Sequence, residues 1–253
     1  MRKTRPLLLV LALGLLLGAC KSKTEEIAPA APAQFVQLQP GKFIVYRVDS
    51  LIFTNSGRDI EHRRYQERHV VDSLITDGLG RPSWRVYRSV RDSAGTGAWS
   101  PRGTYLVTLS GNTLETIEDN LRFISLAAPL RTGATWKGGR YLGTRPYTGI
   151  YTYSSELNIA DWNFTVQNTG GSENINGTTY NDVLTVTAID ELAESPISPQ
   201  TVYTSESRYT TKWAAGIGLV YQRYVLWEYQ NPGAPSTPFY IGFGVERSIL
   251  DHN

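Results

Sequence analysis

Apolar and polar residues alternate along most of the chain from Phe35 onward. Alternation with a period of two is typical of β-strands whose two faces meet different surroundings. Short turn signals that contain glycine, such as Asn55-Ser56-Gly57, separate the alternating runs. The pattern predicts strands at 43–53, 60–76, 84–91, 105–109, 113–118, 162–166, 183–189 and 213–229.

The strongest alternation runs from Trp213 to Tyr229, where only Arg223 interrupts an apolar face. A straight strand of that length would exceed about 50 Å at a rise of about 3.3 Å per residue. We therefore expect it to bend, with Gly216 and Gly218 permitting a kink or bulge.

Helical signals are confined to 155–160 and 190–194, and each segment is long enough for only a turn or two. The many glycines and prolines between short alternating runs favour strands joined by turns. We predict an all-β, antiparallel fold: a strongly curved sheet, open barrel or sandwich of long strands. Residues 34–253 suit one such domain, because no second linker interrupts them.

The first twenty residues have a different character. Three basic residues at positions 2, 3 and 5 precede an uncharged apolar run, Leu7 to Leu17, and two small residues then lead to Cys20. This order is that of a secretory signal segment. The apolar run is too short to span a bilayer, which takes about 20 residues.

Leu17-Gly18-Ala19-Cys20 resembles the lipobox of bacterial lipoproteins. The resemblance implies a signal peptide at 1–19, a diacylglycerol on the sulfur of Cys20, and an acyl chain such as palmitate on its amino group. Several acyl chains hold a protein stably on a membrane. Residues 20–33 then form the lipidated cysteine and a charged, Pro- and Ala-rich tether.

The alternative is an ordinary cleaved signal followed by a chance or core cysteine. Cys20 is the only cysteine, and oxidising compartments favour paired ones. Lipid attachment explains both the position of Cys20 and the lack of a second cysteine to pair with it.

Cleavage would also change the charge. The chain has 25 basic and 23 acidic residues, and loss of the three basic signal residues leaves 22 against 23. The near-neutral remainder gives no support to a nucleic-acid partner.

Candidate catalytic and metal-binding patterns are few. The chain has three histidines, of which His62 and His69 would point to opposite faces of a regular strand. With the cysteine assigned to lipid, no ligand set for a transition metal is recognisable, and we expect neither metal nor cofactor. No serine lies in a Gly-x-Ser-x-Gly elbow.

Catalytic carboxylate pairs meet in space and leave no sequence trace. The acidic residues of the later strands and loops are expected to be solvated: Asp182, Asp190, Glu191 and Glu194. Whether the protein is an enzyme stays open, with the weight of the sequence against it.

Arginines concentrate between positions 58 and 91, where aromatic residues are interleaved with them. Guanidinium groups beside aromatic rings can grip anionic sugars or lipid headgroups, so Trp84, Arg85, Tyr87 and Arg88 are candidate ligand-binding residues. The alternative is a solvated face of mixed charge, because acidic residues occupy the same stretch. The 15 tyrosines and 6 tryptophans fit either a core or a ligand platform.

Beyond the lipobox, the chain resembles lipoproteins of unknown function that are common in Bacteroidota. The similarity lies in short strings at 40–50, 133–136, 176–184 and 213–220, which are structural in character. It brings no established activity. Such bacteria O-glycosylate exported proteins at Asp followed by Ser or Thr and an apolar residue or Thr.

The glycosylation pattern coincides with a short sequence that recurs within the chain. Val48-Asp49-Ser50-Leu51-Ile52 recurs at 71–75, with a fainter copy at 91–94. The resemblance therefore makes Ser50, Ser73 and Ser93 candidate O-glycosylation sites. The alternative is that neighbouring strands share local patterning, since three short copies do not make a repeat architecture.

The resemblance also bears on location. Residues 21–23 lack the acidic residue that would suggest inner-membrane retention in some bacteria, so we expect placement at the outer membrane, with the leaflet unresolved. The leading hypothesis is a lipid-anchored, non-enzymatic binding or assembly module for a glycan, lipid or envelope protein. The alternatives are an envelope hydrolase whose carboxylates converge in the fold, and a periplasmic lipid carrier.

Overall fold

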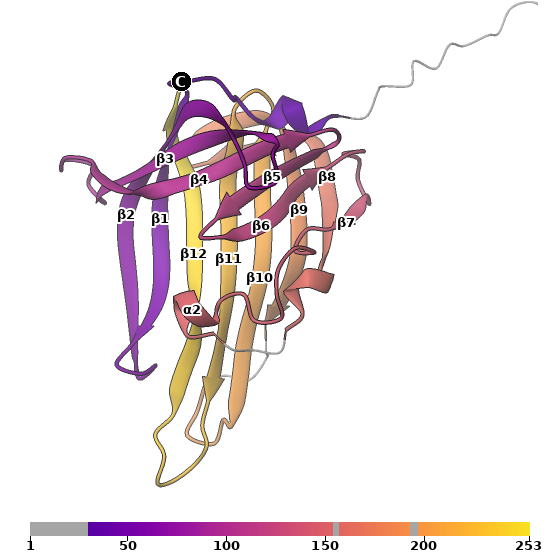
Figure 1. The fold of residues 1–253 in the computed structure, drawn as a ribbon. Helices are drawn as coiled ribbons and strands as arrows, with labels where there is room; N and C mark the ends of the chain where they lie inside the picture. Colours follow the sequence, from indigo (N-terminus) through magenta and orange to yellow (C-terminus); the bar gives the residue numbers. More distant parts are fainter. Residues whose placement is uncertain (1–29, 154–156, 193–196) are drawn as a thin grey trace, which may run out of the picture.

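The computed structural model describes residues 30–153, 157–192 and 197–253. The predicted fold class is correct: the strands form a single antiparallel sheet, curved into a nearly closed barrel (Figure 1). The signal segment and Cys20 lie outside the described residues. In chain order the strands are β1 (Phe43–Thr54), β2 (Asp59–Thr76), β3 (Pro82–Asp92), β4 (Ser100–Ser110), β5 (Thr113–Glu118), β6 (Leu121–Ala127), β7 (Thr135–Lys137), β8 (Asn163–Ile175), β9 (Thr178–Leu192), β10 (Tyr203–Ala214), β11 (Gly218–Gln230) and β12 (Phe239–His252).

The sheet consists of two meanders joined along one seam. Its strand order is β6-β5-β4-β3-β2-β1-β12-β11-β10-β9-β8-β7. Strands β1 to β6 follow one another on one side, β7 to β12 on the other, and the first and last strands pair at the seam. The seam therefore brings residues from the two ends of the chain onto neighbouring strands.

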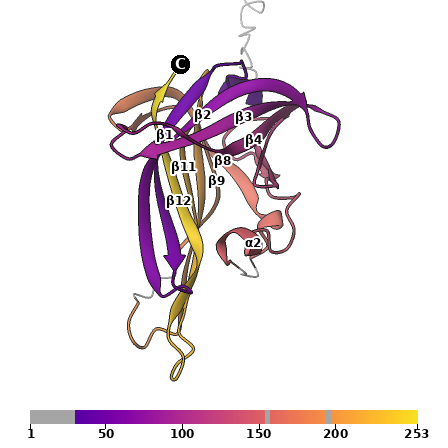
Figure 2. The same ribbon diagram turned by 60° about the vertical axis from the view of Figure 1, so that its left-hand side comes forward.

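Strong curvature brings the two ends of this sheet together. β3 and β4 cross the upper part of the long strands β10 to β12 (Figures 1 and 2). At the meeting of the two end strands, the Ile124 backbone N–H of β6 donates at 2.8 Å to the carbonyl of Gly138, which follows β7. The Trp136 indole N–H of β7 donates to the Ile124 carbonyl at 2.8 Å. Register shifts in the β2–β3, β3–β4 and β10–β11 ladders add to the bending.

The predicted long strand at 213–229 is wrong in one respect. The chain reverses between Ala214 and Gly218, so that β10 and β11 form a hairpin. Gly216 has φ +72°, a left-handed conformation that lets the backbone turn tightly. The glycine expected to kink a strand ends it instead.

Other boundaries also differ from the predictions. The sequence pattern missed β6, β7, β12 and the part of β10 before Trp213. The predicted turn at 190–194 is wrong for Asp190–Leu192, which complete β9. Helical structure is limited to η1 (Pro32–Phe35), α2 (Thr148–Tyr151) and η2 (Ile159–Asp161) in the described part. Residues 30–33, placed in the tether, lie against the sheet: Ala30 bridges to Leu130, and Pro32 is buried.

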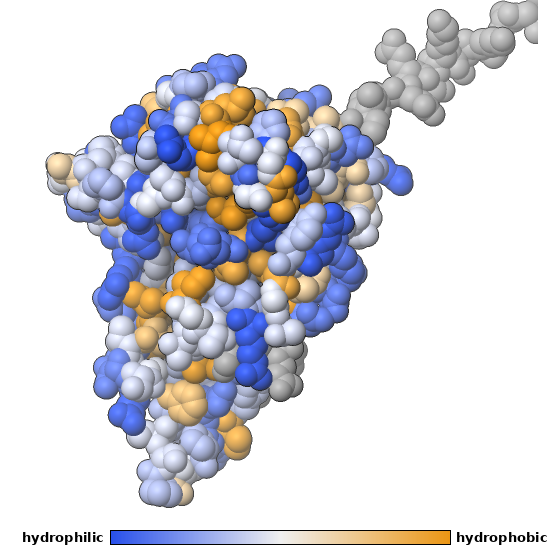
Figure 3. Space-filling model, viewed as in Figure 1, coloured by the Kyte–Doolittle hydropathy of each residue, from blue (hydrophilic) through white to orange (hydrophobic). Residues whose placement is uncertain are grey.

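Two hydrophobic clusters stabilise the folded sheet. The larger one lies inside the curve and includes Val86, Leu114, Phe164 and Leu226; the smaller one includes Val48 and lies around β12. Many aromatic residues belong to this core rather than to an exposed platform: Tyr46, Tyr147, Tyr153, Tyr180, Tyr209, Trp213, Tyr224 and Tyr229. The surface of the face seen in Figure 3 is mixed, with apolar patches among polar residues.

Candidate functional site

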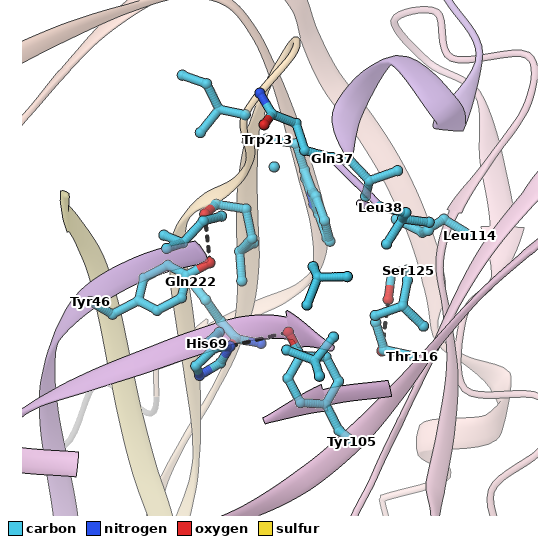
Figure 4. A pocket seen from close by; sticks show the side chains of 18 of the residues that line it. Gln37, Leu38, Tyr46, His69, Tyr105, Leu114, Thr116, Ser125, Trp213 and Gln222 are labelled. Atoms are coloured by element: carbon cyan, nitrogen blue, oxygen red, sulfur yellow. Dashed lines mark hydrogen bonds between the residues drawn. The ribbon is translucent and has the colours of Figure 1, made fainter. Parts of the chain in front are cut away.

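The upper part of the curved sheet contains a partly open cavity of about 130 Å³ (Figure 4). Strands β1 to β6 and β10 to β12 contribute to its walls. Its apolar lining includes Val71, Val86, Val107, Leu114 and Trp213. An apolar cavity of roughly 150 Å³ holds a benzene-sized group, so this space suits a short apolar group.

A cluster of charged side chains forms one wall of this cavity. Arg247, from β12, is the centre: its Nε lies 3.2 Å from Glu67 Oε2, and its Nη2 lies 3.2 Å from Glu118 Oε1. Its Nη1 donates to Gln222 Oε1 at 2.7 Å. Glu67 is 1% exposed, so its charge is compensated almost entirely by protein groups.

The seam positions these groups. Val48 of β1 pairs with Arg247, and Tyr46 of β1 pairs with Glu67 of β2. Glu67 and Arg247 are therefore two strands apart, or roughly 10 Å at about 4.8 Å per strand. The long arginine side chain covers that distance. Glu118 reaches the same point from β5, because the sheet curls over.

Both carboxyl groups are held in the ionised form. Burial alone would raise the pKa of the Glu67 carboxyl, but the charge of Arg247, with His69 and Arg88, holds it well below its usual range. Burial likewise opposes ionisation of Glu118, and Arg247 and Arg88 lower its pKa. Arg88 also contacts Asp119 at 3.5 Å.

A histidine and two tyrosines complete this wall. His69 Nε2 lies 3.1 Å from Glu67 Oε2. On its other side, His69 Nδ1 lies 3.1 Å from the Tyr105 hydroxyl (Figure 4). The Tyr46 hydroxyl donates to the Leu219 carbonyl at 2.8 Å. Burial raises the pKa of both tyrosines, which therefore stay protonated. The cavity thus offers hydroxyl and amide groups beside an internally paired cluster.

This arrangement bears on the alternative of a hydrolase with two catalytic carboxyl groups. The two glutamates do converge in the fold. A glycosidase needs one carboxylic acid whose pKa is raised so that it can donate a proton. Here arginines lower the pKa of both groups. Their geometry fits charge compensation and ligand positioning better than proton donation.

A second cavity, of about 100 Å³, lies on the other side of the cluster. Its own lining includes Tyr147 and Tyr151 of the α2 region. The side chains that line both cavities are Thr116, Glu118, Tyr209, Gln222 and Arg247. The shared side chains thus divide an apolar compartment from an aromatic one.

The structure separates the four ligand-binding candidates of β3. Arg88 is 7% exposed and belongs to the buried cluster, and Trp84 packs against the larger core. Arg85 instead pairs with Asp72 and lies over the ring of Tyr87, which is 44% exposed. Neighbouring residues of a strand face opposite sides, so these four form no common site.

The mixed-charge stretch that contains them is only partly solvated. Glu67 and Arg88 are buried, so the expectation of a solvated face is wrong for these two. His62 is exposed and His69 is buried, which fits the predicted opposite faces. Asp182, Asp190 and Glu191 are exposed as expected, and Glu194 lies outside the described residues.

The three candidate glycosylation serines differ in their surroundings. Ser50 is half-buried, and its hydroxyl lies 3.2 Å from that of Tyr65. Ser73 is half-buried and donates to Asp72 at 2.6 Å. Ser93 is exposed in the turn after β3. Of the three, Ser93 is the most accessible to a modifying enzyme.

The sequence reading did not single out Glu118, Gln222 or Arg247. Glu118 ends a short amphipathic strand, and the other two lie among ordinary polar residues of β11 and β12. One available signal was an isolated charge on an otherwise apolar strand face. Such a signal cannot identify its partner.

The described residues contain no group of three or more His, Cys, Asp or Glu side chains arranged to hold a metal ion. None of the helices in the described ranges is long and apolar enough to cross a membrane. The chain matches no known protein-family model and no curated protein sequence.

Proposed function

We propose that this protein is a lipid-anchored binding module of the bacterial outer membrane whose curved sheet holds a small amphipathic ligand. The observation that supports it most is the apolar cavity of about 130 Å³ with a polar wall. A short apolar group would fill the space between Val86, Val107 and Trp213. The ligand's polar group would face Tyr105 and Gln222.

The electrostatics favour an uncharged polar group. Arg88 and Arg247 balance Glu67 and Glu118 within the wall. A charged ligand group would have to compete with these internal ion pairs and lose its own hydration. A hydroxyl or amide can exchange hydrogen bonds with the wall at lower cost. An aliphatic alcohol is therefore the simplest probe.

Bromohexanol tests the proposal, because bromine quenches tryptophan fluorescence at contact and Trp213 lines the cavity. We expect saturable quenching in the unaltered protein and its loss in Trp213→Phe. Val107→Phe fills the space and should weaken binding by at least about tenfold. Leu109→Phe, on the same strand but exposed, should bind normally.

Thermal unfolding of each variant would show that the sheet is intact. Quenching that does not saturate, or that is equal in Val107→Phe and the unaltered protein, would contradict ligand binding in this cavity.

A further inference from the structure

The roof of the apolar cavity is made by chain that precedes the sheet. We call residues 32–38 the strap; it starts as η1 and continues across the top of β10 and β11. Val36, Gln37 and Leu38 line the cavity, and the last two lie along its upper edge in Figure 4. The strap is therefore the part that a ligand entering from above would have to displace.

Few bonds fasten the strap to the sheet. Within the described residues, the hydrogen bonds from the strap to the β10–β11 hairpin both involve Gly216 of its turn: the Gly216 N–H donates to the Gln34 carbonyl at 2.7 Å, and the Gln37 amide donates to the Gly216 carbonyl. Phe35, 5% exposed, adds an apolar anchor. Segments with few protected hydrogen bonds open at a lower free-energy cost than paired strands.

Gln37 also carries a feature that points to a ligand. Its Oε1 is buried and has no hydrogen-bond partner. Because the Gly216 carbonyl can only accept, the amide nitrogen must face it, and the oxygen is left unpaired. A buried acceptor without a partner destabilises the closed position, because it has lost its hydrogen bonds to water. A donor group on a ligand below the strap would remove this cost and favour the closed position.

We propose that the strap is the gate of the apolar cavity, and that Gln37 latches it while accepting a hydrogen bond from a hydroxyl or N–H of the ligand. This inference rests on the proposed ligand binding. It adds the route of entry and a required donor group on the ligand. Along the chain, the strap comes shortly after the segment that leads from Cys20.

A reversible disulfide tests the gate. Ala30 and Leu130 are partners in an antiparallel bridge, whose Cα atoms lie about 4.5–5.5 Å apart, within disulfide range. The variant Ala30→Cys/Leu130→Cys, made with Cys20→Ser, holds the start of the strap. We expect oxidation to slow bromohexanol association and release by about tenfold in stopped-flow quenching, and reduction to restore both rates.

The latch has a matched control within the same segment. Gln37→Ala should accelerate release of bromohexanol, whereas Gln34→Ala, which removes an exposed amide whose own bond is to Ala31, should not. Equal rates in the oxidised and reduced double-cysteine protein, with binding intact, would overturn the gate alone. Absence of saturable binding in the reduced protein would overturn the proposed function itself.

Discussion

At the scale of single residues, the buried cluster depends on charges that compensate one another. Glu67 is buried beside Arg247 and His69, and its pKa lies below the ordinary value of 4.5. A carboxyl whose pKa is lower in the folded than in the unfolded state stabilises the fold above the unfolded value. That contribution is lost as the pH falls from there toward the folded value.

We therefore expect the free energy of unfolding, measured in urea, to decline as the pH falls below about 4.5. Glu67→Gln should be less stable at neutral pH and should show a shallower decline, because one of the shifted groups is gone. Glu191→Gln, exposed at the end of β9, should follow the unaltered protein. Parallel pH curves for Glu67→Gln and the unaltered protein would contradict this account.

At the scale of elements, the turn between β10 and β11 shows what the hydrophobic periodicity could not predict. The alternation around Gly216 is continuous across the hairpin, so the apolar pattern gives no sign of the reversal. The turn at Gly216 reverses the chain: Gly216 has φ +72°, and the Ile217 N–H donates to the Ala214 carbonyl at 3.2 Å. Strand positions were predictable because alternation is local; the choice between bend and reversal depended on packing.

Gly216→Ala should lower the free energy of unfolding by about 1–2 kcal/mol. No heavy atom lies within 4 Å of an added Cβ, so the cost comes from the backbone conformation alone. Gly78→Ala is the control: its Cβ would also meet open space, and its φ is not in the left-handed range. Equal urea midpoints for the two variants would argue against a strained turn.

At the scale of the whole molecule, the cavity exists because both ends of one sheet meet near Ile124 and Trp136. The alternation along individual strands does not predict that the two ends of the sheet come together. The membrane anchor, in contrast, is a prediction from the first twenty residues alone, and Cys20 lies outside the described part. Together they would make a ligand-holding domain on a short tether.

The anchor predicts that cells expressing the protein incorporate labelled palmitate into it and retain it in the membrane fraction. Cys20→Ser should lose the label and release the chain from the membrane, since acyl chains supply the binding energy. Ser22→Ala, two residues away, is the matched control. Palmitate incorporation that persists in Cys20→Ser would contradict lipidation at this residue.

The sequence by itself determined the strand-rich fold class and most strand positions, because alternation and turn residues act over a few neighbouring positions. It also predicts the anchor, from the lipobox-like pattern that ends at Cys20. The tertiary structure decided the closure of the sheet and the cluster of Glu67, Glu118 and Arg247. Those groups are far apart in the chain and meet only through strand pairing and curvature. The buried cluster and the cavity beside it are therefore properties of the folded sheet.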